Sequence, residues 1–185
     1  LELTVSGPVL KFFSDTVVAL AGAEMPMMLD GKPVKHDEAL LVRAGQTLTI
    51  GAIRGPGQRA YLAVAGGFDA PVVMGSRATF GLGQFGGNAT GPLRAGHVLR
   101  LARARQADMK PAIEPADLTR DWSVGVVYGP HGAPDFFLTE DIETLFSTEY
   151  EVHFNSARTG VRLIGPAPKW ARTDGGEAGL HPSNL

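Results

Sequence analysis

The sequence predicts a mainly β protein whose short antiparallel strands form a barrel or a sandwich. Three observations support this fold class. Short apolar and β-branched runs recur at regular intervals through the first part of the chain. Turn sequences rich in Gly and Pro separate these runs, and the 185 residues include 24 Gly and 13 Pro. Hydrophobic residues make up 44% of the chain, which is enough for a buried core.

The first β-rich half is predicted to span residues 1–105. Its expected strands, in chain order, are 1–5, 9–13, 17–21, 27–29, 39–42, 47–50, 60–64 and 98–101. Turns are expected where Gly supplies a positive φ, as in 30–33, 43–46 and 94–97. Strands this short at such spacing are typical of antiparallel all-β architectures.

A polar run containing Pro, residues 106–120, is interpreted as a linker or a surface crossing. The second β-rich half, 121–185, then opens with a predicted strand at 122–128. Thr139 is expected to cap a short helix whose first turn carries Glu140 and Asp141. Further strands are predicted at 150–154 and 161–164. Because Leu1 lies directly in a strand pattern, we expect a piece of a larger domain.

The composition argues against several partners. The 17 Lys and Arg against 19 Asp and Glu give a net charge of -2, so neither nucleic acid nor an anionic membrane surface is expected. The apolar runs are too short to span a bilayer. The absence of Cys removes disulfides and thiolate metal sites, and it fits a cytoplasmic protein. The five His lack the paired spacing of metal ligands, so no metal is expected.

The residues best suited to chemistry lie in the closing segment, 170–185. Polar and charged side chains there are separated by Gly175, Gly176, Gly179 and Pro182, which permit close backbone approach. A frayed tail is the alternative, but the segment follows an apolar strand and begins with a Trp, which favours a functional loop. The chemically active members are Arg172, Asp174, Glu177, His181, Ser183 and Asn184.

Two other loops carry candidate ligand groups. His131 and Asp135 lie in a loop that contains two prolines, just before the predicted helix, where a site and a simple helix entry stay equally open. Asn155 and Arg158 occupy a polar turn, in which ordinary turn chemistry is the alternative to ligand contact.

The run 81–86 has the spacing of a dinucleotide-binding fingerprint. Gly87, Asn88, Gly91 and Pro92 follow it, and these residues do not start a helix. We therefore expect a glycine-rich loop beside a site, or a wide turn, and no nucleotide there.

The closing segment closely resembles the carboxyltransferase part of urea carboxylase, the biotin-dependent half of urea amidolyase. The residues that carry the resemblance are WARTDGGEAGLHPSN at 170–184 and NSARTGVRLIGP at 155–166, and it extends through 129–137 and 59–69. The last of these, RAYLAVAGGFD, is shared together with GSRAT at 75–79 by the broader allophanate hydrolase subunit 2 family, which includes a subunit of 5-oxoprolinase.

The resemblance implies a cyclophilin-like antiparallel β-barrel with one or two short helices, of which this chain is an incomplete piece truncated at its C-terminus. It also implies a ligase component that moves CO2 from carboxybiotin to urea and gives allophanate, and that is not active as an isolated fragment. Biotin would be attached to a separate biotin carrier domain, and ATP would be used by a separate biotin carboxylase domain. These domains of the same enzyme are the expected partners.

For this reaction we assign roles to the closing segment and the polar turn. Asp174, Glu177 and His181 are the catalytic candidates, with His181 or Asp174 relaying the proton. Asp174, Glu177 and Asn184 are expected to contact urea or the biotin ureido group. Arg172 or Arg158 steadies a carboxylate or the leaving biotin. The backbone N–H groups of Gly175 and Gly176 hold an oxyanion. Asn155 and Ser183 complete this substrate-binding set, and His131 and Asp135 are additional candidates.

Two alternatives stay open. One is a non-catalytic regulatory module of the same family that binds a protein partner. The other is a carboxyltransferase or amidohydrolase subunit that acts on another small amide, such as guanidine or 5-oxoproline. The glycine-spaced polar segment favours an enzyme, because a partner-binding surface more often displays exposed aromatic anchors.

Overall fold

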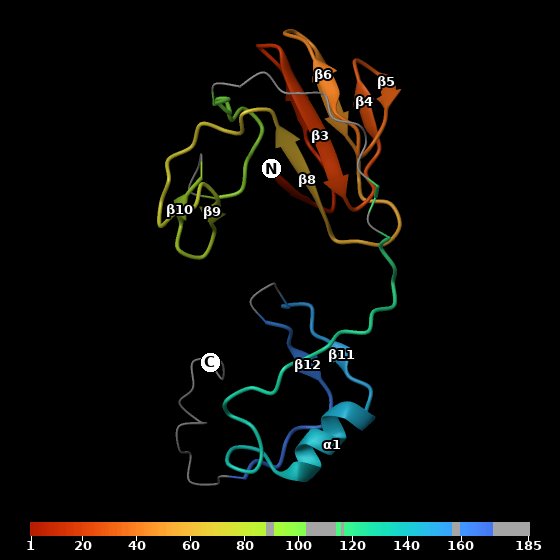
Figure 1. Ribbon diagram of the computed structural model, residues 1–185, viewed down its shortest axis with the longest axis vertical. Helices are drawn as coiled ribbons and strands as arrows, with labels where there is room; N and C mark the ends of the chain where they lie inside the picture. The colour runs from red at the N-terminus through yellow and green to blue at the C-terminus, as the bar shows by residue number, and fades with distance from the viewer. Residues whose placement is uncertain (88–90, 103–113, 116, 157–159, 172–185) are drawn as a thin grey trace. The chain divides into compact units, whose positions relative to one another are not determined.

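A computed structural model describes residues 1–87, 91–102, 114–115, 117–156 and 160–171. The chain divides into two compact units, 1–122 and 123–185, each of which is described by itself. Strands dominate the described part, which contains a single short helix (Figure 1). The prediction of a mainly β protein is therefore confirmed. No helix in this part is both long enough and apolar enough to cross a membrane.

The first unit contains two four-stranded antiparallel sheets. In the first sheet the strand order is β1-β8-β3-β6, with β1 at Glu2–Thr4, β8 at Arg59–Val64, β3 at Thr16–Gly22 and β6 at Leu40–Val42. β3 pairs with β8 through a register that places Leu20 opposite Leu62. Side chains along β3 alternate between buried and half-buried, as expected for a strand with one face on the core.

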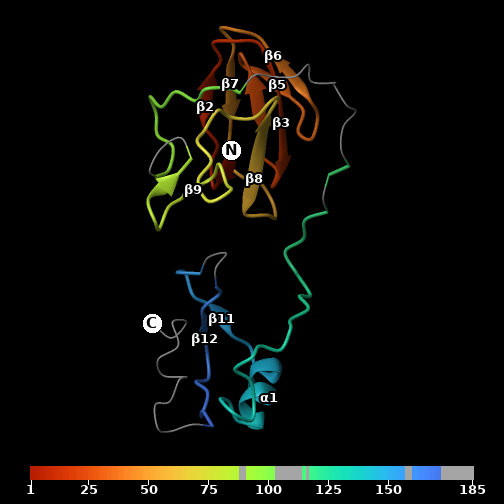
Figure 2. The ribbon, with the colours of Figure 1, turned by 60° about the vertical axis from the view of Figure 1, so that its left-hand side comes forward.

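The second sheet has the order β2-β7-β4-β5. Figure 2 labels β2, β7 and β5 of this sheet. Its strands are β2 at Val9–Lys11, β7 at Thr47–Ile50, β4 at Met27–Leu29 and β5 at Lys32–Val34. Residues 30–33 were predicted to form a turn, so β5 was missed. Pro33 is accommodated because β5 lies at the edge of the sheet, where the missing N–H leaves no ladder bond unmade.

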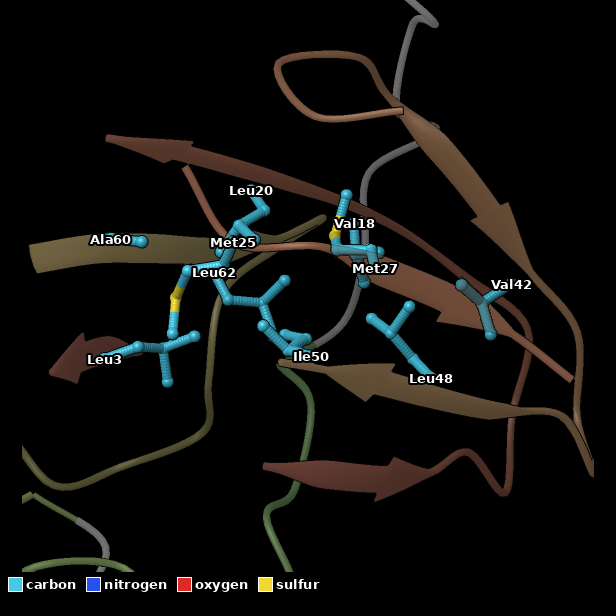
Figure 3. Close-up of a cluster of buried hydrophobic side chains, with 10 residues drawn as sticks. All are labelled: Leu3, Val18, Leu20, Met25, Met27, Val42, Leu48, Ile50, Ala60 and Leu62. Atoms are coloured by element: carbon cyan, nitrogen blue, oxygen red, sulfur yellow. The ribbon is translucent and has the colours of Figure 1, made fainter. Parts of the chain in front are cut away.

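Both sheets contribute to one hydrophobic core (Figure 3). Leu20 and Leu62 come from the first sheet, and Leu48 and Ile50 come from the second. The complete cluster is Leu3, Val18, Leu20, Met25, Met27, Val42, Leu48, Ile50, Ala60 and Leu62. The described sheets are not closed into a barrel, so the predicted barrel stays a prediction.

The glycine-rich run 81–86 belongs to a small hairpin. β9 at Thr79–Phe80 pairs with β10 at Phe85–Gly86, and the rings of Phe80 and Phe85 have centroids 5.3 Å apart. A Cβ at Gly86 would lie 2.5 Å from the carbonyl oxygen of Ala78, so the close strand approach requires glycine. The fingerprint spacing therefore reflects hairpin packing.

The second unit contains α1 at Thr139–Ser147 and a hairpin of β11 at Glu151–Val152 with β12 at Leu163–Ile164. Thr139 was expected to cap the helix, but the N-cap is Leu138, which has the extended backbone of that position (φ -72°, ψ 155°). Leu138 has no side-chain acceptor. The carboxylate of Asp141 instead accepts the backbone N–H of Leu138 from inside the first turn.

Two predicted strands are wrong. Residues 122–128 form no strand, although Val124 and Val126 have the expected side chains. In the range 98–101, Leu101 makes only an isolated bridge to Phe68. A strand requires a partner as well as β-forming residues, and the described backbone offers no ladder to either run.

Candidate functional site

Most predicted site residues lie outside the described residues. His131, Asp135 and Asn155 lie within the described residues. The candidates beyond the described part are Arg158, Arg172, Asp174, Gly175, Gly176, Glu177, His181, Ser183 and Asn184. The structure does describe the residues that lead into the closing segment, and these contact the loop that carries His131 and Asp135.

The loop 129–137 is held in place by Tyr128, the residue that precedes it. The backbone N–H of Ala133 donates to the hydroxyl of Tyr128 at 2.9 Å. Gly132 packs on the ring of Tyr128 so closely that a Cβ there would overlap the ring. The N–H of Phe136 donates to the carbonyl of Gly132 at 3.0 Å, which closes the turn. Tyr128 and the loop's own backbone therefore give the loop a defined conformation.

His131 and Asp135 have different surroundings on this loop. The imidazole of His131 is half-buried and meets the edge of the Phe136 ring, with centroids 4.6 Å apart and planes at 84°. The side chain of Asp135 is exposed. Packing thus fixes the imidazole, whereas the carboxylate faces solvent.

The approach segment, Lys169–Ala171, joins this loop to the start of the closing segment. The N–H of Ala171 donates to the carbonyl of Phe136 at 3.0 Å. The ring of Trp170 lies 4.8 Å from the ring of Phe137, at an interplanar angle of 33°. Successive residues of the approach segment are therefore bound to successive residues of the loop.

Asp141 binds the same approach segment from the first turn of α1. One carboxylate oxygen accepts the N–H of Lys169 at 2.8 Å, and the other accepts the N–H of Leu138 at 3.0 Å. These groups lower the pKa of Asp141, with the Lys169 N–H the largest cause. Desolvation opposes this effect, while the N–H groups of Leu138 and Trp170 and the charge of Lys169 add to it. The carboxylate is therefore ionised at neutral pH.

The turn after β11 is organised by Ser156. Its hydroxyl donates to the carbonyl of His153 at 2.7 Å and accepts the N–H of Arg162 at 3.0 Å. The N–H of Asn155 donates to Nδ1 of His153 at 3.0 Å, which gives that imidazole a structural role. The Asn155 side chain is exposed to solvent in this turn.

The structure brings two of the predicted motifs together, namely the His131 loop and the beginning of the closing segment. Sequence reasoning missed the residues that make this junction: Phe137, Asp141 and Trp170. The sequence does show Asp141 in the first helical turn and an aromatic residue in each segment, Phe137 and Trp170. Their contacts join parts of the chain that are far apart in sequence, so no local pattern indicates them. In the described residues, no group of three or more His, Cys, Asp or Glu could hold a metal ion.

Comparisons with known proteins agree on one family. The model of the carboxyltransferase domain, subdomain A and B, matches residues 1–185. A urea amidolyase of Lachancea kluyveri is 45% identical over the whole chain, which spans 11% of that relative's length. A 5-oxoprolinase subunit of Escherichia coli is 36% identical over 60% of this chain and 35% of its own length.

A solved structure gives the same result for the fold. The crystal structure of the Kluyveromyces lactis urea carboxylase superposes with a TM-score of 0.84 at 42% identity. The superposition covers 98% of this chain and 17% of that structure. The chain therefore corresponds to a small part of much longer relatives.

Proposed function

Because the chain belongs to the family of carboxyltransferase domains, subdomain A and B, we propose that it forms part of the site at which a biotin-dependent enzyme carboxylates urea to allophanate. The observation that carries the proposal is the match to this family over residues 1–185. The junction at Phe136 and Ala171 supports it, since it fixes the start of the segment that holds most candidate residues.

The substrate defines what the site must provide. Urea is a small neutral molecule with N–H donors on both nitrogens and one strong acceptor oxygen, and its amide nitrogen is a weak nucleophile. A site for its carboxylation must accept N–H bonds, hold the carbonyl oxygen and remove a proton. Carboxylate and amide oxygens suit the donors, which are the groups that Asp174, Glu177 and Asn184 offer.

The site must also accept a proton from urea and stabilise negative charge. Asp174 or His181 accepts the proton that the urea nitrogen loses as its bond to carbon forms. Arg172 or Arg158 holds the carboxylate in place, and backbone N–H groups at Gly175 and Gly176 stabilise negative charge. Three residues of chain span at most about 11 Å, so Asp174 has a short tether to the anchored Ala171.

Biotin fits this set of residues by its chemistry. Its ureido ring needs hydrogen-bond partners for an N–H group and an oxygen, and the closing segment combines carboxylates, a guanidinium group and glycine N–H groups. When bound, carboxybiotin supplies the CO2. In this proposal a separate carrier domain presents it after an ATP-using biotin carboxylase domain has loaded it, and the enzyme is cytoplasmic.

In the same proposal residues 1–105 and 121–185 are two β-rich halves joined by 106–120. Further strands of the intact protein complete a cyclophilin-like barrel around the described sheets.

The test uses the intact enzyme with its biotin and ATP modules. Asp174→Ala and Glu177→Ala are each expected to lower urea-dependent ATP turnover about 100-fold or more, as removal of a positioned acid or base does. ATP use without urea should stay at the wild-type level. Glu143→Ala, an exposed acid on α1, is the matched control. Wild-type urea-dependent rates in both Asp174→Ala and Glu177→Ala would exclude these residues from the site.

The match to a 5-oxoprolinase subunit favours a second candidate, an enzyme component that acts on another small amide. A substrate panel of urea, guanidine and 5-oxoproline separates the candidates. Stimulation by urea alone supports the first proposal. Stimulation by guanidine or 5-oxoproline with no response to urea supports the second.

A further inference from the structure

We propose that Asp141 is a positioning residue, which holds the approach segment against the first turn of α1 and thereby fixes where the closing segment begins. The inference rests on the proposed function, because it assumes that the closing segment carries the site. Asp141 itself is not proposed to touch the substrate. Its effect reaches the reaction through the backbone of Lys169–Ala171.

Asp141 binds backbone groups from two separate parts of the chain. Its carboxylate accepts the N–H of Leu138 at 3.0 Å and the N–H of Lys169 at 2.8 Å. A carboxylate has two oxygens that both accept, whereas Asn has one oxygen and Ala has no acceptor. An ionised acceptor also makes shorter and stronger bonds than a neutral one. Asp is therefore the residue suited to bind both segments at once.

Every residue of the approach segment has its own anchor. Lys169 is held by Asp141, Trp170 packs on Phe137, and Ala171 donates to the carbonyl of Phe136. Trp170 also adopts a positive φ of 61°, a conformation that surrounding contacts must stabilise in a residue with a side chain. The position of this backbone is therefore set by several contacts, of which the Asp141 carboxylate supplies the charged one.

The sequence beyond Ala171 is rich in glycine. It contains Gly175, Gly176 and Gly179, and glycine loses more conformational freedom on ordering than any other residue. A fixed starting point restricts the positions that such a chain can reach. Loss of the anchor should therefore affect transfer to urea more than the folding of the unit.

The experiment compares Asp141→Ala, Asp141→Asn and Glu140→Gln in the intact enzyme. Glu140 is the matched control, because it is an exposed acid in the same helical turn. Asp141→Ala is expected to lower the urea-dependent kcat at least 10-fold, and Asp141→Asn by an intermediate factor because one acceptor oxygen remains. Glu140→Gln should stay within about twofold of wild type. ATP use without urea should be unchanged in all three.

Hydrogen exchange read by mass spectrometry supplies the structural readout. In Asp141→Ala, the amides of Lys169–Ala171 should exchange at least 10-fold faster. The amide of His153, which donates to the carbonyl of Arg162 at 2.9 Å in the β11–β12 hairpin, should exchange at the wild-type rate. This pattern identifies a local release of the approach segment.

The two proposals fail in different ways. A wild-type enzyme without urea-dependent turnover overturns the proposed function. An active wild type in which Asp141→Ala leaves either kcat or the exchange of Lys169–Ala171 unchanged overturns the positioning role. If Asp141→Ala unfolds the unit, Asp141→Asn decides: a kcat equal to that of Glu140→Gln overturns the proposal, and a lower kcat with a wild-type His153 amide supports it.

Discussion

Gly22 and Arg59 are in direct backbone contact where β3 passes β8. A Cβ at Gly22 would lie 2.7 Å from the carbonyl oxygen of Arg59, and Gly22 has φ +108°. The same carbonyl accepts the N–H of Ala23 at 2.7 Å. A side chain at this position therefore meets both a backbone clash and a disfavoured conformation.

Gly22→Ala should lower the free energy of unfolding of the first unit by about 2 to 5 kcal/mol, which combines the cost of positive φ with that of overpacking. Thermal unfolding followed by circular dichroism measures it. Gly31→Ala is the control, because Gly31 has φ +78° and no atom within 4 Å of an added Cβ. Its loss should be only about 1 to 2 kcal/mol. Equal losses in the two variants would show that the contact with Arg59 is unimportant.

Most strands of the two sheets in the first unit were predictable from the sequence because their signals are local. A continuous apolar run predicted a strand at 17–21, and the structure has β3 at Thr16–Gly22. β5 was missed because Pro33 argues against a strand until its edge position is known. The range 122–128 was wrong for the opposite reason: its side chains suit a strand, but pairing depends on residues elsewhere.

For the candidate site, the sequence singled out the loop of His131 and the closing segment, but not the contact between them. The residue content of each stretch indicated chemistry. The bond from Ala171 to Phe136 joins positions far apart in the sequence, and both partners are backbone groups that carry no sequence signal. Asp141 was interpreted only as a favourable acid in the first turn of a helix. Its bond to the Lys169 N–H became visible only in the structure.

Asp30 makes the stability of the first unit depend on pH in the acid range. Its carboxylate accepts the N–H of Thr47 and the amide of Gln46, each at 2.8 Å, and these bonds lower its pKa below the ordinary 3.8. A folded-state pKa below the unfolded value means that the contribution of Asp30 to stability is complete above about pH 3.8. It is lost as pH falls through the folded pKa.

Asp30→Asn should therefore lower the melting temperature at pH 7, and its difference from wild type should shrink as the pH falls below 3.8. Melting curves between pH 7 and pH 2.5 measure both effects. Glu24→Gln removes one negative charge at an exposed position and serves as the control. A difference between Asp30→Asn and wild type that stays constant across this range would contradict the assignment.

Ser156 should control how well the β11–β12 hairpin presents its polar turn. Its hydroxyl bonds both the carbonyl of His153 and the N–H of Arg162, so Ser156→Ala removes a bond within the turn and a bond to the residue before β12. A net hydrogen bond contributes about 1 kcal/mol, which corresponds to roughly a fivefold change in an equilibrium constant. We expect the KM for urea to rise by about this factor, because Asn155 and Arg158 lie in the same turn.

Steady-state kinetics of the intact enzyme check this prediction, together with hydrogen exchange at the amide of Arg162, which should accelerate in Ser156→Ala. Ser156→Thr keeps the hydroxyl and should restore both values. Ser147→Ala, at the exposed last residue of α1, tests for a general effect of losing a serine. Faster exchange at Arg162 with an unchanged KM would mean that the turn folds as described but that neither Asn155 nor Arg158 contacts the substrate.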